Sequence, residues 1–90
     1  DGSPMQPVPV SKLIEDTLSF CRQRFRAQGV TLEVTPVPED LEILARPVQI
    51  SQVLLNLLNN AFDAVHGTPV RIISIDVAAR DGGAEVSVAD

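Results

Sequence analysis

Apolar residues recur at helical spacing in two places along this chain, and each place predicts one amphipathic helix. The first runs from Ile14 to Phe25, where apolar residues fall at i, i+4, i+7 and i+11. Ser11 is expected to cap that helix and Gly29 to end it. The second helix is predicted over 47–66, because a proline opens it and Gly-Thr-Pro follows it.

Alternating or β-branched stretches lie on both sides of the helices and predict strands. They occupy 30–34, 41–45, 70–79 and 85–90, and the proline-interrupted stretch 6–10 is an edge strand or a linker. Glycines between the last two stretches predict a hairpin turn, so that pair is expected to be antiparallel. We therefore expect an α+β fold, a two-layer α/β sandwich in which two main helices pack on a mixed sheet of about four to five strands.

Composition narrows the classes of function. The 90 residues are 44% hydrophobic and 21% charged, which is ordinary for one small globular domain. The net charge of −5 and the lack of a basic stripe argue against nucleic-acid binding. Cys21 is the single cysteine, which excludes an intramolecular disulfide, and its place on an apolar helix face predicts a small buried hydrophobe. No apolar run reaches the roughly 18–20 residues of a membrane span, and a cytoplasmic setting is expected.

The second predicted helix carries an unusual polar face. On a wheel at about 100° per residue, its polar residues share one arc: Gln49, Gln52, Asn56, Asn59, Asn60 and Asp63. An ordinary solvated face would carry Glu, Lys and Arg, yet no charged residue stands between Arg46 and Asp63. Asparagine is also a poor helix former, so this face costs the helix some stability.

Three of these residues have the spacing of a ligand set. Asn56, Asn60 and Asp63 stand at i, i+4 and i+7 and direct short oxygen-bearing side chains to one place. Mg²⁺ takes few protein oxygens and completes its shell with water and phosphate oxygens. This polar face therefore predicts a Mg²⁺–phosphate site on the side of a helix. In the alternative interpretation, the asparagines bridge to a neighbouring loop or to carbonyls at strand ends.

The segment QVLLNLLNNAFDAV, residues 52–65, closely resembles the N box of the ATP-binding domain of sensor histidine kinases, in the gyrase/Hsp90/histidine-kinase/MutL superfamily. The family pattern N-L-L-x-N-A stands here at 56–61, and the preceding ARPVQISQVLL resembles its lead-in. The order of predicted elements over 10–90 agrees with the first part of that fold. The resemblance implies that 7–90 is the N-terminal part of such a domain, with 1–6 a linker or an expression remnant.

The resemblance also implies roles for individual residues toward ATP and Mg²⁺. Asn60 matches the asparagine that coordinates the Mg²⁺ bridging the ATP phosphates, and Asn56 matches a second polar residue facing the phosphates and the metal. Asp63 matches a position that contacts nucleotide phosphate or ribose, often as Lys, Arg or His. Asp90 follows a strand like the one that leads into the G1 box, D-x-G-x-G, and so matches the aspartate that binds the adenine amino group.

Position 56 distinguishes branches of the superfamily. Gyrase-, MutL- and Hsp90-like ATPases typically carry there a glutamate that activates water, and so do serine-kinase anti-sigma factors and mitochondrial-type dehydrogenase kinases. Asn56 has no comparable basicity. The resemblance therefore implies transfer of the γ-phosphoryl group to a histidine, in an enzyme whose partners are its own dimerisation and phosphoacceptor domain and a response regulator. No catalytic side chain is assigned.

Two functions remain open. In the first, the chain is part of the ATP-binding domain of a histidine kinase, free or anchored to a membrane, and is inactive alone, because the family's later glycine-rich boxes, ATP lid and phosphoacceptor helix are not in the sequence. In the second, it is a nucleotide-free folding or interaction unit that self-associates through apolar surface and open strand edges. His66 is expected to end the second helix as its cap, and not to accept phosphate.

Overall fold

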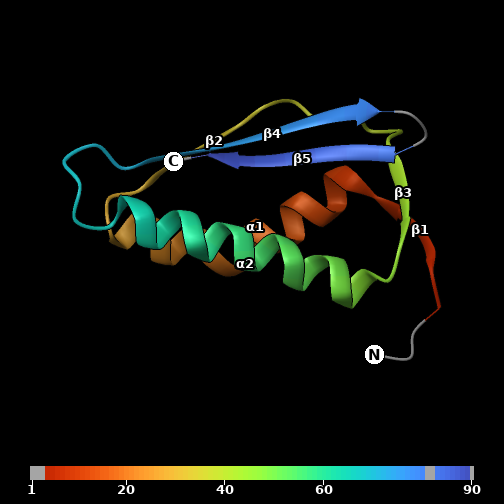
Figure 1. The fold of residues 1–90 in the computed structure, drawn as a ribbon, viewed down its shortest axis with the longest axis horizontal. Helices are drawn as coiled ribbons and strands as arrows, with labels where there is room; N and C mark the ends of the chain where they lie inside the picture. The colour runs from red at the N-terminus through yellow and green to blue at the C-terminus, as the bar shows by residue number, and fades with distance from the viewer. Residues whose placement is uncertain (1–3, 81–82, 90) are drawn as a thin grey trace.

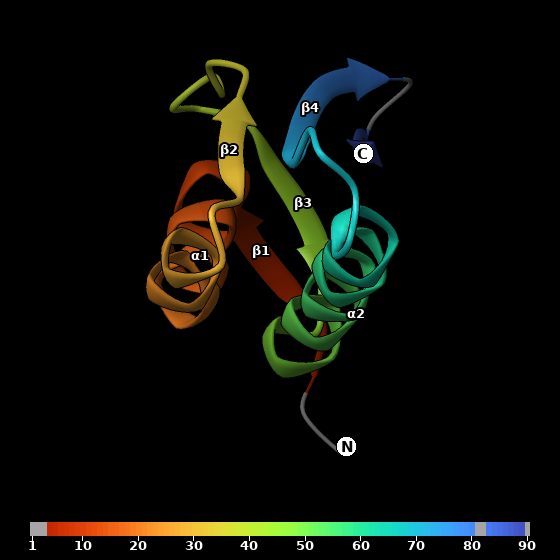
Figure 2. The ribbon, with the colours of Figure 1, turned by 90° about the vertical axis from the view of Figure 1, so that its left-hand side faces the viewer.

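The computed structural model describes residues 4–80 and 83–89, and these residues form a two-layer α+β fold. The elements follow the order β1 (Gln6–Pro9), α1 (Val10–Ala27), β2 (Thr31–Val34), β3 (Glu42–Ala45), α2 (Pro47–Val65), β4 (Ile72–Arg80) and β5 (Gly83–Ala89). Both helices lie on the same side of β4 and β5 (Figure 1) and run next to each other (Figure 2). The predicted fold class is confirmed. None of the helices in the described residues is long and apolar enough to cross a membrane.

The five strands divide between two sheets. In the larger sheet, β2 is parallel to β4, and β4 is antiparallel to β5, as the predicted hairpin required. In the smaller one, β1 and β3 pair antiparallel. β3 contacts β5 but, within the described residues, does not pair with it. Gln6–Pro9 of the predicted stretch 6–10 is therefore a true strand, and Val10 already belongs to α1. The strand avoids the penalty that proline carries in a central strand because it lies at an edge.

The core lies between the helices and the larger sheet. The apolar face predicted for the first helix is buried, as is one face of the second helix, and alternate residues of β4 and β5 point toward them. Buried residues of both helices and of β4 make up its centre: Cys21, Phe25, Leu54, Leu58, Ala61, Val65, Ile73 and Ile75. Cys21 is a small buried hydrophobe as predicted, and burial raises the pKa of its thiol.

The start of α1 differs from the prediction. Ser11 does not cap it, because the helix begins at Val10 with Pro9 as the N-cap residue and no side-chain cap. The Val10 N–H instead donates to the carbonyl of Leu41, at 2.9 Å. A free N–H at a helix start needs an acceptor, and here a residue distant in sequence supplies it.

The ends of both helices follow the predicted signals. Gly29 has φ 71° and lies just past α1, where the Val30 N–H donates to the Phe25 carbonyl and the Gly29 N–H to the Arg26 carbonyl. These two bonds make a Schellman motif. Pro47 is the first residue of α2, and His66 is its C-cap residue, as predicted. The position of α2 along the chain, and so of its polar face, was predicted correctly.

Candidate functional site

α2 presents different side chains in each direction around its axis. Four residues spaced three or four apart face the sheet and are buried: Leu54, Leu58, Ala61 and Val65. The polar residues Asn56, Asn60 and Asp63 lie on the opposite side of the helix and are exposed. We call these three residues the outer row. The two flanks of the helix, between the outer row and the buried face, carry different side chains, and each flank borders a different groove.

The outer row is free to bind a ligand. Within the described part of the chain, no hydrogen bond or ion pair engages the side chains of Asn56, Asn60 or Asp63. A residue and the residue four positions later are neighbours on a helix surface, so the two amides and the carboxylate form one continuous strip of oxygens. The outer row is therefore a set of short oxygen ligands with no partner of their own in this structure.

Asn59 departs from the predicted stripe. Its Oδ1 accepts a hydrogen bond from the Arg24 guanidinium of α1, at 2.5 Å, and its side chain is half-buried. The alternative interpretation, in which the asparagines bridge to a neighbouring loop or to carbonyls at strand ends, is wrong in its partner for Asn59, which bonds to a side chain of the helix α1. Asn56 and Asn60 make no such bridge within the described residues and stay exposed.

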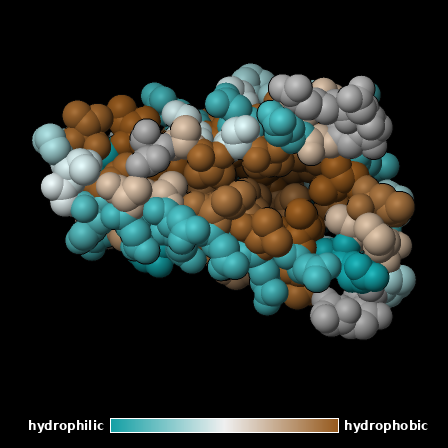
Figure 3. Space-filling model, viewed as in Figure 1, coloured by the Kyte–Doolittle hydropathy of each residue, from teal (hydrophilic) through white to brown (hydrophobic). Residues whose placement is uncertain are grey.

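An apolar groove lies on the flank of α2 that faces β5. Val53 and Leu57 are 49% and 41% exposed, although both are large and apolar. Together with six other residues they line a hollow of about 200 Å³: Leu13, Ile43, Ile50, Leu54, Ala84 and Val86. Figure 3 shows this hollow as an apolar depression between the helix and the sheet. We call it the β5-side groove.

The β5-side groove adjoins the outer row. Val53 precedes Asn56 by three residues, and Leu57 precedes Asn60 by three, so each apolar side chain borders an amide on the helix surface. A ligand with one apolar part and one anionic, metal-bound part would be matched by this arrangement. Sequence reasoning missed Val53 and Leu57, because an apolar residue between a polar stripe and a buried face resembles core.

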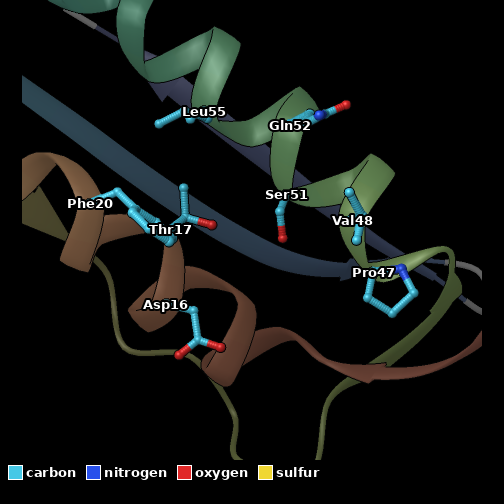
Figure 4. A pocket seen from close by; sticks show the side chains of 8 residues that line it. All are labelled: Asp16, Thr17, Phe20, Pro47, Val48, Ser51, Gln52 and Leu55. Carbon is cyan, nitrogen blue, oxygen red and sulfur yellow. The ribbon is translucent and has the colours of Figure 1, made fainter. Parts of the chain in front are cut away.

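A second, larger hollow lies on the other flank, between α1 and α2. It has about 340 Å³, and Figure 4 shows its lining: Asp16, Thr17, Phe20, Pro47, Val48, Ser51, Gln52 and Leu55. Two of its polar groups are occupied, because Asp16 pairs with Lys12 at 3.4 Å and the Thr17 hydroxyl donates to the Leu13 carbonyl at 2.8 Å. Gln52 points away from it (Figure 4). This α1-side groove offers apolar contact and the hydroxyl of Ser51, whereas the outer row offers three short oxygen-bearing side chains without partners among the described residues, so the outer row is the better candidate site.

The chemistry of the outer row suits magnesium better than metals that need a protein cage. The described residues contain no group of three or more His, Cys, Asp or Glu side chains that could hold a metal ion. A metal bound here would depend on amide oxygens and on oxygens that its ligand brings, which is how Mg²⁺ is commonly held beside phosphates. Asp90, the predicted adenine-binding residue, lies outside the described residues.

Comparison with known sequences connects this chain to sensor kinases. It is 29% identical over 84 residues to the C4-dicarboxylate transport sensor protein DctB of Rhizobium meliloti, and 33% identical over 88 residues to the sensor histidine kinase ZraS of Escherichia coli. These matches cover 93% and 96% of this chain. The chain spans 14% and 18% of the length of these relatives. No family model matches it.

Solved structures give the same result for the fold. The catalytic domain of histidine kinase ThkA superposes with a TM-score of 0.85 at 24% identity, covering 96% of this chain and 57% of that one. The structure of ThkA in complex with response regulator protein TrrA matches with a TM-score of 0.81 at 26% identity, covering 93% of this chain and 25% of that one. The chain thus has the fold of a histidine kinase catalytic domain, and the resemblance first seen at 52–65 is confirmed.

Proposed function

We propose that this chain is part of the ATP-binding catalytic domain of a sensor histidine kinase, and that the outer row of α2 binds Mg²⁺–ATP for histidine autophosphorylation. The observation that carries the proposal is the position of Asn56 and Asn60. Both amides are exposed and without a partner in the described residues, and each stands three residues after an apolar residue that lines the β5-side groove. The sequence relatives and the fold supply the context of a kinase.

Asn60 and Asn56 would hold Mg²⁺ through their side-chain oxygens. When bound, Mg²⁺ supplies neutralisation of the charge on the phosphate oxygens. Asp63, one turn beyond Asn60, favours a cation and repels a bare phosphate, so the anionic ligand is expected to approach with its metal. Val53 and Leu57 would contact apolar parts of the nucleotide and exclude water beside the amides. Asp90 is proposed to accept the adenine amino group.

The side chain at position 56 favours phosphoryl transfer over hydrolysis. An amide does not take up a proton near neutral pH, so Asn56 offers no general base to activate water. A phosphoacceptor histidine brings its own nucleophilic nitrogen and needs no such base from this helix. The residues of this chain would then act by binding and orienting ATP, which is where most catalysis of phosphoryl transfer arises.

The proposal extends to the arrangement of the whole protein. Residues 7–90 would be the N-terminal part of the ATP-binding domain, with 1–6 as a linker. Its partners would be the enzyme's own dimerisation and phosphoacceptor domain and a response regulator, as the ThkA structure contains a response regulator. The domain would work in the cytoplasm.

The alternative function, self-association without nucleotide, has its own support in the structure. Several large apolar side chains are exposed, and Phe20, at 80%, is the most exposed of them. An apolar patch of this kind can mark an interface between proteins. Sedimentation of the 90-residue chain at rising concentration tests this function, because a stable dimer would appear whether or not ATP is present.

An NMR titration of the chain with a non-hydrolysable ATP analogue, with and without Mg²⁺, tests the proposed function. Mg²⁺-dependent shifts of the side-chain amides of Asn56 and Asn60 are expected. Asn60→Ala should remove the Mg²⁺ dependence and lower affinity for the Mg²⁺-bound analogue by roughly tenfold or more.

Gln49→Ala is the matched control, since Gln49 is an exposed amide on the same helix, two turns before Asn56. It should leave the affinity unchanged. Equal losses in the two variants, or shifts that ignore Mg²⁺, would contradict the proposed metal site. Repetition on the complete kinase would show whether the site acts in autophosphorylation.

A further inference from the structure

The geometry points to Arg24 and Asn59 as positioning residues that fix the rotation of α2 about its own axis. By fixing that rotation they set the direction in which Asn56 and Asn60 face. The structural part of this inference is independent of nucleotide binding. Its consequence for Mg²⁺–ATP rests on the proposed function.

Arg24 makes three contacts that together connect the last turns of the two helices. Its guanidinium donates to Asn59 Oδ1 at 2.5 Å. The guanidinium carbon lies 4.7 Å from the centre of the Phe62 ring and 5.4 Å from that of the Phe25 ring. The two rings stack at 5.0 Å with 23° between their planes, and Phe25 is fully buried. The arginine therefore covers an aromatic pair and reaches beyond it to the amide.

This arrangement suits arginine specifically. A guanidinium is planar, so it can lie against an aromatic ring while its N–H groups donate to an acceptor beside that ring. Lysine would keep the charge near the rings but would lose the planar fork. Asn59 is the neighbour of Asn60 in sequence, so a hydrogen bond that holds position 59 also holds the helical turn that carries the proposed ligand.

The rest of α2 explains why such a restraint is needed. The buried face holds the helix against the sheet, but the flank toward the β5-side groove is open, with Val53 and Leu57 about half exposed. Little packing on that flank opposes a roll of the helix toward the groove. Among the described residues, Asn59 is the α2 residue whose side chain hydrogen-bonds to another element. Its bond to Arg24 lies on the flank opposite the groove and so limits that roll.

The three asparagines of α2 then have two different roles: one restrains the helix, and the other two are the proposed metal ligands. Asn59 has its oxygen committed to α1, and Asn56 and Asn60 keep theirs free. Groups that orient metal ligands without touching the metal commonly change metal affinity when they are removed. The Arg24–Asn59 pair would act in that way through the helix backbone.

Residual dipolar couplings of the backbone amides test the rotation in the nucleotide-free chain. Arg24→Met removes the hydrogen bond and the cation over the rings but keeps an apolar stem of similar length. The couplings of α2 should change relative to those of β4. Arg26→Met is the matched control, because Arg26 is an exposed arginine in the same last turn of α1 and its loss changes the net charge equally. If both variants leave the couplings of α2 unchanged, the inference is wrong.

Asn59→Ala provides a milder test if Arg24→Met unfolds the chain. It deletes the hydrogen bond and leaves Arg24 over the Phe62 ring. It should change the α2 couplings in the same direction, and the double variant should change them little further, because the two residues act as one unit. Additive changes would overturn the inference.

The functional consequence is read from the ratio of nucleotide-analogue affinity with Mg²⁺ to that without it. Arg24→Met should lower this ratio by roughly tenfold, and Arg26→Met should not. A loss that is equal with and without Mg²⁺ would mean that Arg24 only stabilises the fold, and would overturn the inference. If the unmodified chain shows no Mg²⁺-linked binding, the proposed function fails, and the dipolar couplings still decide the role of Arg24.

Discussion

The two flanks of α2 differ in how they are covered. On the flank toward α1, Phe62 stacks on the buried Phe25, and Arg24 lies over both rings. On the flank toward β5, Val53 and Leu57 line an open groove. The flank toward α1 is therefore closed along the C-terminal half of α2, beyond the α1-side groove, whereas the flank toward β5 is left apolar and accessible.

This difference teaches how a thin domain can hold a ligand site. A domain of this size has little core to spare, and exposed Val and Leu side chains contribute less to folding than buried ones. Under the proposed function, the apolar side chains left open beside the uncommitted amides serve binding and not stability. The closed flank would supply the rigidity that the open flank lacks. The comparison predicts that substitutions on the two flanks have different consequences.

The largest expected effect belongs to the closed flank. Phe25→Ala should lower the free energy of unfolding by about 3–5 kcal/mol, because it empties a fully buried aromatic position and removes the partner of Phe62. Phe20→Ala, on the same helix but 80% exposed, should change it by no more than about 0.5 kcal/mol. Urea unfolding followed by circular dichroism measures both. Similar losses in the two variants would mean that the aromatic stack does not hold the helices together.

Much of this fold was predictable because its signals are local. The extent of α2 follows from a proline at its start and a glycine just past its end, and the end of α1 from Gly29. The mistaken cap at Ser11 shows the limit of such signals. The acceptor that decides where α1 begins is the Leu41 carbonyl, which is brought there by the pairing of β1 with β3. No pattern near Ser11 records it.

Some features of the candidate site were likewise predictable from local sequence, and others depend on residues distant in the chain. The exposure of Asn56 and Asn60 followed from their spacing on a helix wheel. The different role of Asn59 depends on Arg24, 35 residues earlier in the chain. The groove depends on which side of α2 its neighbours leave uncovered, so Val53 and Leu57 could not be told from core residues by their pattern.

An intermediate effect is expected on the open flank, and it concerns binding. Val53→Ser should lower affinity for the Mg²⁺-bound ATP analogue by about fivefold, because it removes roughly 1 kcal/mol of apolar contact. Val48→Ser is the matched control, since Val48 is 55% exposed against 49% for Val53 but lines the α1-side groove. Calorimetric titration compares the two affinities, and thermal unfolding should show little change in either. A greater loss of affinity in the Val48 variant would contradict this prediction and would indicate that the nucleotide binds on the α1-facing flank.

The smallest expected effect concerns Cys21, one turn before Phe25 on α1, and it tests whether water reaches the packed region between the two helices. Burial raises the pKa of the Cys21 thiol above its ordinary value of 9.0. The unfolded chain then releases the thiol proton at lower pH than the folded chain does. The contribution of this thiol to stability is complete below pH 9 and is lost as pH rises through the folded pKa. Unfolding of the chain and of Cys21→Ala, compared between pH 7 and 10.5, isolates this contribution because the variant lacks the titrating group. If the difference between them stays constant with pH, water reaches the thiol, and the closed flank is looser than its packing indicates.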